Sequence, residues 1–119
     1  MKHILMIATG GTIASKATAD GLTPQLTSKE LLAEVPELEQ LCRIDTVQLM
    51  NRDSTNINSR DWLQMAACVR AHYDAYDGFV LTHGTDTMAY TAAALSYLIQ
   101  NNAKPVVITG SQKSIFNQD

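Results

Sequence analysis

The sequence has little of several features that would point to particular classes of protein. It contains no apolar run of about 18 residues, so no membrane span is predicted. Its net charge of -3 comes from scattered acidic and basic residues, which argues against a nucleic-acid surface. Its two cysteines, Cys42 and Cys68, have no metal-ligand spacing and are interpreted as small buried side chains in a reducing compartment.

Near the N-terminus there is only a short apolar run, which meets glycines and polar residues instead of a cleavage site. We therefore predict a first strand and no signal peptide, and we expect a cytoplasmic protein.

What the sequence does have is a 45% share of hydrophobic residues, enough for one domain with a modest core. Short apolar runs predict strands at residues 4–8, 44–50, 79–81 and 106–108. Helical patterns lie between them, at residues 59–76 and at about 88–100. This alternation predicts an α/β fold, with a mainly parallel sheet flanked by helices on both faces.

Three details of this pattern are also predicted. Residues 15–24 are small, polar and rich in turn formers, which favours a loop, either a lid or a plain connection. A capping-box spacing at residues 27–30 predicts a short helix that ends before Pro36. Ser59 is predicted to cap the long helix, in which Trp62 and the tyrosines pack against the core.

Three of the predicted strands end in loops that contain threonine and glycine. These loops begin with Thr9-Gly10-Gly11-Thr12, Thr82-His83-Gly84-Thr85-Asp86 and Thr109-Gly110-Ser111. Each could be only a turn, with Thr12 as its cap. Because parallel strands place their carboxyl ends at one edge, however, we expect all three loops to converge there, which turns alone explain less well.

Several polar residues in these loops have two interpretations. Asp86, near a predicted helix start, is either a helix cap or a fixed negative charge that faces a cationic ligand group. His83 is either a structural hydrogen-bonding residue, which is commoner, or a general base. The short polar side chains of residues 51–56, which include Asp53, Ser54 and Thr55, can form local turns, and the hydroxyls and donors of this loop could hold a carboxylate.

Two kinds of chemistry fit these loops. In the first, Thr12 is the nucleophile of a hydrolase, and loop N–H groups stabilise the oxyanion. In the second, the chain is a nucleotide- or phosphate-binding module. The sequence argues against the second, because Thr9-Gly10-Gly11-Thr12 lacks the third glycine of a dinucleotide fingerprint and the lysine of a P-loop.

The motifs 8–14 (ATGGTIA) and 82–88 (THGTDTM) resemble the two signatures of bacterial-type L-asparaginases. The stretches 53–55 and 109–112 match the family as well, so the resemblance covers nearly the whole chain. Individual residue choices are more similar to the cytoplasmic, type I branch.

This resemblance implies hydrolysis of L-asparagine to L-aspartate and ammonia, with L-glutamine as a second candidate substrate. It implies that Thr12 is the nucleophile, that Thr85 is the second catalytic threonine, and that Asp86 binds the substrate α-ammonium group. Ser54, between Asp53 and Thr55, would hold the α-carboxylate. The resemblance implies no metal or organic cofactor, a homo-oligomer, and closure of loop 15–25 over the substrate.

The chain departs from the family pattern at three places. Leu22 stands where many members have a catalytic tyrosine, and no proline follows Gln112 closely. The family's catalytic lysine would lie beyond Asp119, because Lys113 follows the wrong strand. Residues 1–119 therefore correspond to an N-terminal catalytic domain without the second α/β domain, and we predict that they are inactive alone.

Two other functions remain open on the sequence. One is a non-catalytic domain that keeps an amino-acid pocket. The other is the related amidotransferase subunit that acts on glutaminyl-tRNA precursors. In that subunit an extra N-terminal domain would precede the first motif. Only a few residues precede the motif in this sequence, so we expect an asparaginase and not the amidotransferase subunit.

Overall fold

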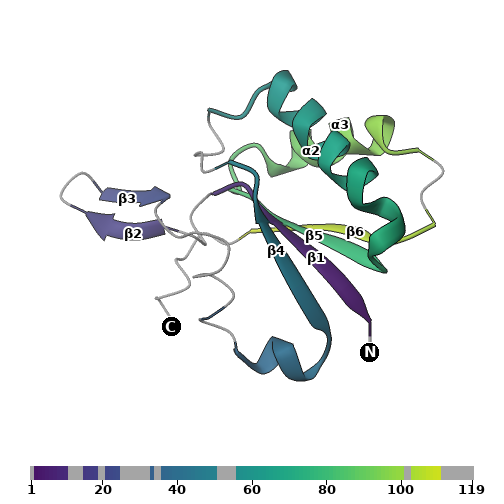
Figure 1. Cartoon of the computed structure of the whole chain (residues 1–119). Helices are drawn as coiled ribbons and strands as arrows, with labels where there is room; N and C mark the ends of the chain where they lie inside the picture. The colour runs from purple at the N-terminus through teal and green to yellow at the C-terminus, as the bar shows by residue number, and fades with distance from the viewer. Residues whose placement is uncertain are drawn as a thin grey trace.

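The computed structural model describes residues 2–10, 15–18, 21–24, 33, 36–50, 56–100 and 103–110. At its centre is a four-stranded parallel sheet in the order β4-β1-β5-β6 (Figure 1). The strands are β1 (His3–Ala8), β4 (Arg43–Gln48), β5 (Gly78–Thr82) and β6 (Val106–Thr109). The α/β fold and its parallel sheet are confirmed.

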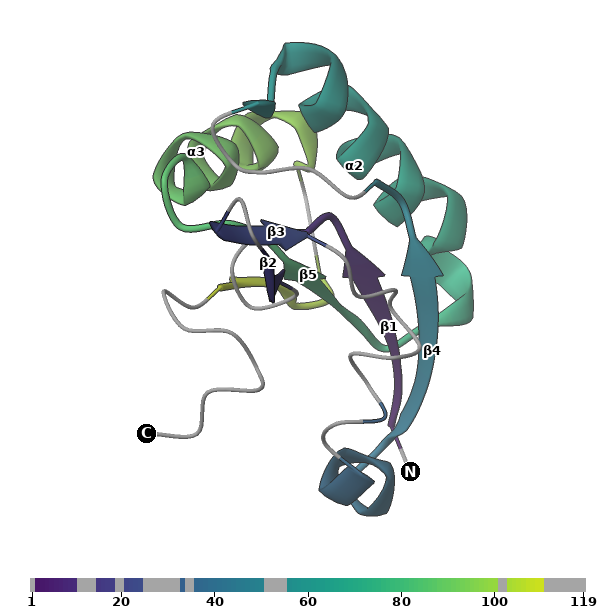
Figure 2. The same ribbon diagram turned by 90° about the vertical axis from the view of Figure 1, so that its left-hand side faces the viewer.

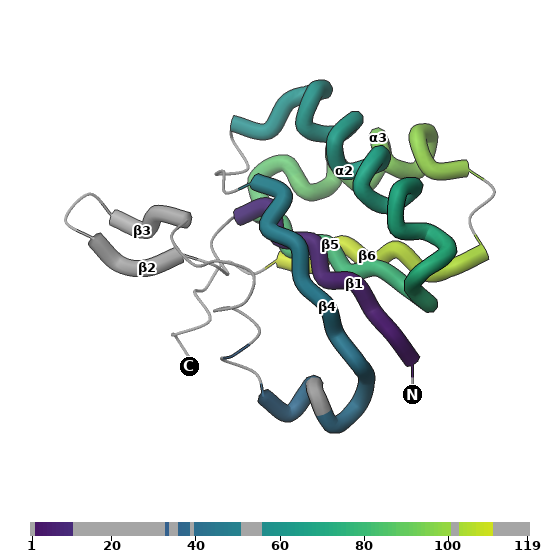
Figure 3. Tube along the Cα trace, viewed as in Figure 1, coloured from purple at the N-terminus to yellow at the C-terminus, as the bar shows by residue number. Residues whose placement is uncertain are grey.

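Strand β1 lies between β4 and β5, and the three traces run side by side in Figure 3. Its middle residues Leu5, Met6 and Ile7 are all buried, although neighbouring side chains point to opposite faces of the sheet. A strand covered on both faces needs a continuous apolar run, and the run at the start of the chain meets this need.

In the part of the chain that the structure describes, helices α2 (Ser59–His72) and α3 (Met88–Leu98) lie on the same face of the sheet, as Figure 2 shows. The core between helices and sheet is formed by apolar side chains of β1, β5 and both helices, and its members include Leu5, Ile7, Met65, Val69, Phe79, Leu81 and Leu95. Trp62, Tyr73 and Tyr76 pack against this core, as predicted. The tyrosines lie beyond α2, in and after the 3-10 helix η4 (Tyr73–Ala75).

The start of α2 corrects one prediction, because Asn58 and not Ser59 is the N-cap. The Asn58 Oδ1 atom accepts a hydrogen bond from the Asp61 N–H group at 3.1 Å. In return, the Asn58 N–H group donates to Asp61 Oδ2 at 3.1 Å. This reciprocal pair is a capping box that Ser59, one position inside the helix, cannot form.

On the opposite face of the sheet, the described chain contributes the 3-10 helix η2 (Pro36–Gln40), which begins at the proline predicted to interrupt a helix. An apolar hollow of about 320 Å³ lies on this face. Its lining includes Leu38 of η2, Cys42, and the strand residues Ile4 and Ile44. The short helix predicted from residues 27–30 onward lies almost wholly outside the described residues.

Residues 15–24 correct the prediction of a loop, since they form an antiparallel hairpin of β2 (Ser15–Thr18) and β3 (Gly21–Pro24). The register pairs Thr18 with Gly21 and Ser15 with Pro24. Threonine, which occurs in both strands, favours extended backbone. Proline is tolerated at a strand end, where its missing N–H group costs little.

Candidate active site

The four parallel strands end in one row at a common edge of the sheet. The register aligns their last residues, which are Gln48, Ala8, Thr82 and Thr109 in sheet order. The predicted convergence of the loops after β1, β5 and β6 is therefore confirmed, and the loop after β4 begins at the same edge.

Hydrogen bonds continue past the strand ends into the loops. The Thr9 N–H group donates to the Thr82 carbonyl at 3.2 Å, and the His83 N–H group donates to the Thr109 carbonyl at 2.9 Å. On the other side of β1, the Leu49 N–H group donates to the Ala8 carbonyl at 3.0 Å. These bonds fix the first residues of the loops relative to one another.

The loop after β1 turns at Thr9 and Gly10. The buried Thr9 hydroxyl donates to the Thr82 carbonyl at 2.5 Å, which ties this loop to β5. Gly10 has a φ of 108°, in the left-handed region that favours glycine. The turn of the backbone after β1 thus depends on a glycine that stands two positions before Thr12 in the sequence.

The loop after β5 is held by the side chain of His83, which is 0% exposed. Its Nδ1 atom lies 2.5 Å from the Gly84 carbonyl oxygen, and its Nε2 atom lies 2.9 Å from the Thr91 hydroxyl. The Trp62 Nε1–H group donates to the same hydroxyl at 2.8 Å. Both ring nitrogens are thus occupied, so the structure favours the structural interpretation of His83 over that of a general base.

The loop after β6 approaches the loop after β5 closely at Gly110. A Cβ atom at position 110 would collide with the His83 carbonyl oxygen and would contact the Met88 sulfur at 3.4 Å. Only glycine allows this approach without a shift of the backbone. The two loops are therefore in direct contact where they leave the sheet.

Thr85 and Asp86 stand just before α3, as predicted. Thr85 is half-buried, Asp86 is exposed, and Thr87 is the helix N-cap. The Met88 N–H group donates to the Thr85 carbonyl at 3.4 Å. Asp86 therefore lies one residue before the cap, where the positive end of the helix dipole stabilises a carboxylate.

Thr12 and the trio of Asp53, Ser54 and Thr55 lie outside the described residues. The chain reaches the trio from Met50, whose N–H group donates to the Ala8 carbonyl at 3.4 Å. The described chain before the trio therefore ends at the edge at which β1 and β5 also end.

Sequence reasoning missed Thr91, which is 0% exposed within α3 and bonds His83. The only signal was a hydroxyl in a helix rich in alanine and leucine. It also missed Thr82, whose buried hydroxyl has no hydrogen-bond partner in the part of the chain that the structure describes. An unpaired buried hydroxyl is uncommon in folded proteins.

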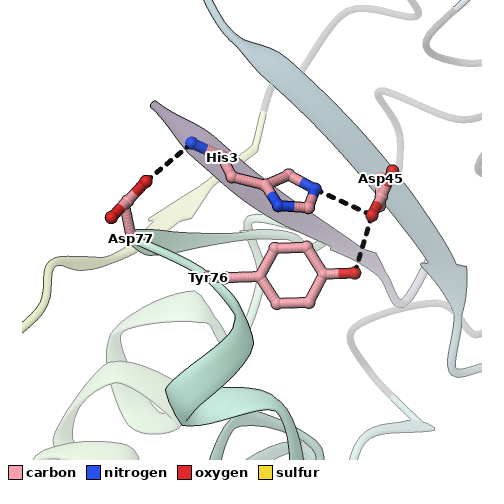
Figure 4. A network of polar contacts seen from close by, with 4 residues as sticks. All are labelled: His3, Asp45, Tyr76 and Asp77. Carbon is pink, nitrogen blue, oxygen red and sulfur yellow. Dashed lines mark hydrogen bonds and ion pairs between the residues drawn. The ribbon is translucent and has the colours of Figure 1, made fainter. Parts of the chain in front are cut away.

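Two ionisable side chains with shifted pKa values, Asp45 and Tyr76, lie away from this edge, in a network near the amino end of β1 (Figure 4). The Tyr76 hydroxyl donates to Asp45 Oδ2 at 2.8 Å, and His3 Nε2 lies 2.8 Å from the same oxygen. These bonds, that from Tyr76 first, lower the pKa of the Asp45 carboxyl group. The same carboxylate raises the pKa of the Tyr76 hydroxyl.

Neither a metal centre nor a membrane span is seen within the described ranges. No three His, Cys, Asp or Glu side chains there lie close enough to hold one metal ion. Among the same residues, no helix has the length and the apolar character needed to cross a membrane.

Comparison with known proteins identifies the relatives of this chain. The sequence profile of the family described as "Asparaginase, N-terminal" matches residues 3–119. L-asparaginase of Thermococcus kodakarensis is 43% identical over 113 residues, which cover 94% of this chain and 34% of that protein. A glutamyl-tRNA(Gln) amidotransferase component of Archaeoglobus fulgidus is 42% identical over 116 residues, covering 96% of this chain and 28% of that protein.

Solved structures agree with the sequence matches. The thermostable L-asparaginase from T. kodakarensis matches with a TM-score of 0.88 and 41% identity, covering 98% of this chain and 36% of that one. A probable cytoplasmic L-asparaginase from Campylobacter jejuni matches with a TM-score of 0.87 and 33% identity, covering 100% of this chain and 35% of that one. The chain thus spans about a third of the length of its relatives.

Proposed function

This chain belongs to the asparaginase family, and from that premise we propose that the whole protein hydrolyses L-asparagine to L-aspartate and ammonia. One observation carries the proposal. Strands β1 and β5 are adjacent and end in register at Ala8 and Thr82. Adjacent strands are about 4.8 Å apart, so the loops that hold Thr12 and Thr85–Asp86 leave the sheet side by side.

In the proposed reaction, Asp86 binds the α-ammonium group, and Ser54, between Asp53 and Thr55, helps to hold the α-carboxylate. The Thr12 hydroxyl attacks the carbon of the side-chain amide and loses its proton. The C–N bond then breaks, and the nitrogen leaves as ammonia with that proton. Water hydrolyses the resulting ester, which releases aspartate and restores the threonine.

The position of Asp86 supports its part in this reaction. Asp86 is exposed at the start of α3, where a negatively charged side chain can attract a cationic group of a ligand. Thr85, half-buried beside it, is the proposed second catalytic threonine. We propose that the reaction needs no metal or organic cofactor, because a hydroxyl nucleophile and fixed polar groups supply its chemistry.

The remaining proposals concern the cellular setting. We place the protein in the cytoplasm, which the similarity to a probable cytoplasmic L-asparaginase supports. We propose that the whole protein is a homo-oligomer that acts on a small amino acid, with L-asparagine preferred to L-glutamine.

The proposal is tested by ammonia release from L-asparagine by the whole protein. Thr12→Ala is expected to lower kcat by about 10³-fold or more, as loss of a nucleophile does. Asp86→Asn is expected to raise KM, because the α-ammonium group loses its charged partner. Ser96→Ala, which removes an exposed hydroxyl on α3, should leave turnover unchanged. A wild-type protein with no turnover, or a fully active Thr12→Ala variant, would refute the proposal.

A second function is favoured by the relative from A. fulgidus, which is named as part of a glutamyl-tRNA(Gln) amidotransferase. In such a reaction the released ammonia would pass to an acylated tRNA, and a protein partner would complete the enzyme. The two functions differ in one requirement. Ammonia release without tRNA supports the asparaginase, whereas release that depends on glutamyl-tRNA(Gln) supports the amidotransferase.

A further inference from the structure

We propose that His83 is a positioning residue whose ring, with a proton on Nδ1, fixes the Gly84–Thr85 peptide and thereby places Thr85 and Asp86. The role in catalysis rests on the proposed function, in which both residues contact substrate. The ring itself touches Gly84 and Thr91 and is fully buried.

The hydrogen bonds define the protonation of the ring. A carbonyl oxygen can only accept, so the Nδ1 atom beside the Gly84 oxygen must carry a proton. The Trp62 indole can only donate, so it uses an acceptor site of the Thr91 hydroxyl and leaves the hydroxyl proton free to point at Nε2. Both hydrogen-bond partners of the ring, the Gly84 carbonyl and the Thr91 hydroxyl, are uncharged.

The groups that hold the ring belong to rigid elements. Thr91 is fully buried in α3, and Trp62 extends to it from α2. The two helices are thus connected through one hydroxyl to the loop after β5. A loop that is bonded to packed helices keeps its geometry better than one that relies on its own turns.

The backbone of His83 is already fixed on both sides. Its N–H group donates to the Thr109 carbonyl at 2.9 Å, and its own carbonyl lies against Gly110. The next peptide, Gly84–Thr85, has the ring as the partner of its carbonyl. Because a peptide is planar and trans, orienting this carbonyl also orients the Thr85 N–H group in the opposite direction.

The first test is a two-bond ¹H–¹⁵N NMR correlation of the His83 ring in the whole protein. We expect the proton on Nδ1 and a bare Nε2 atom. Thr91→Val removes the hydroxyl with little change of shape and should mix the two tautomers. It should also shift the amide signals of Gly84 and Thr85, which the control Ser96→Ala should not. A proton on Nε2, or protons on both nitrogens, would overturn the proposal.

The second test is amidase kinetics of the same proteins, corrected for the folded fraction. Thr91→Val is expected to lower kcat/KM by about fivefold, the effect of one neutral hydrogen bond. Thr91→Ser keeps the hydroxyl and should restore activity to within about twofold of wild type, as should Ser96→Ala. A Thr91→Val variant as active as Thr91→Ser would contradict the positioning role.

Variants at His83 separate positioning from mere packing. In His83→Asn, the side-chain amide can donate near the former Nδ1 position, whereas His83→Leu has no donor. We therefore expect His83→Asn to be more active than His83→Leu, and equal loss in both would contradict the proposal. If wild type lacks amidase activity, the proposed function fails, and the ring and amide signals alone then decide whether His83 positions the peptide.

Discussion

Single residues determine how the loops after β1, β5 and β6 leave the sheet. Gly10 adopts a φ of 108°, and Gly110 packs directly on the His83 carbonyl. These two glycines and the hydroxyl of Thr9 bring the loops into contact within a few residues of the strand ends. The geometry near Thr85 and Asp86 therefore depends on side chains that do not themselves take part in the proposed chemistry.

Gly110→Ala is predicted to destabilise the fold by about 1–3 kcal/mol, because its methyl group would overlap the His83 carbonyl. Gly78→Ala is the matched control. A Cβ atom there meets Pro105 Cγ at 3.2 Å and Ile4 Cδ1 at 3.3 Å, which small shifts can relieve. Urea unfolding of both variants measures the difference. Equal stability of the two would show that the approach of the loops is not tight.

The network in Figure 4 predicts a pH dependence of stability. The pKa of Asp45 is lowered, first by the Tyr76 hydroxyl, so its charged form stabilises the fold. This contribution is fully present above the ordinary aspartate pKa, about 3.9, and is lost as the pH falls through the lower value in the fold.

Tyr76→Phe removes the hydroxyl that makes the largest contribution to this shift. The difference in unfolding free energy between wild type and Tyr76→Phe is therefore predicted to be constant above about pH 5 and to shrink below about pH 4. Tyr90→Phe, at an exposed position of α3, is the control and should show no such trend. A difference that grows on acidification would contradict the account.

At the scale of elements, α2 depends on its capping box. Asn58→Ala is predicted to cost about 1 kcal/mol, because the Asp61 N–H group loses its acceptor. Ser59→Ala, one residue later, should change stability by less than about 0.5 kcal/mol. Thermal unfolding of the two variants compares their stabilities. A larger loss of stability in Ser59→Ala than in Asn58→Ala would show that Ser59 is the helix cap, as the sequence predicted.

Much of the sheet could be predicted because its strands are continuous apolar runs between turn residues. The observed β1, β5 and β6 begin and end within about two residues of the predicted strands, as expected for sequence-based boundaries. The convergence of their loops followed from parallel pairing alone. The hairpin of β2 and β3 was missed, because the same glycine and proline that favour a loop also suit a tight hairpin and a strand end.

Other features depend on contacts that no local pattern contains. The choice between Asn58 and Ser59 as cap is decided by backbone angles at one position. The bond between His83 and Thr91 links a loop to a residue inside the next helix, and Trp62 joins it from a different helix. Sequence reasoning left two interpretations of His83 open, with the structural one as the commoner, and could not identify the partners of its ring.

At the scale of the whole molecule, the two faces of the sheet differ. Helices α2 and α3 cover one face, whereas the hollow lined by Ile4, Leu38 and Ile44 lies on the other. Val107, on that other face, is 52% exposed. An apolar surface of this kind is typical of a face that packs against further structure.

Residues 1–119 alone are predicted to show no measurable turnover of L-asparagine, in contrast to the whole protein. The reason is that the catalytic lysine implied by the family resemblance would lie beyond Asp119. The measurement is ammonia release at equal concentrations of the two proteins. Comparable turnover by residues 1–119 would show that further residues are dispensable.

The most direct test of the central claim is a crystal structure of the whole protein with L-aspartate bound. The account predicts that the Asp86 carboxylate contacts the α-ammonium group while the Thr12 hydroxyl lies at the side-chain carboxyl group of the same molecule. Aspartate bound at another edge of the sheet, or Thr12 and Asp86 too far apart for one amino acid to reach both, would contradict it.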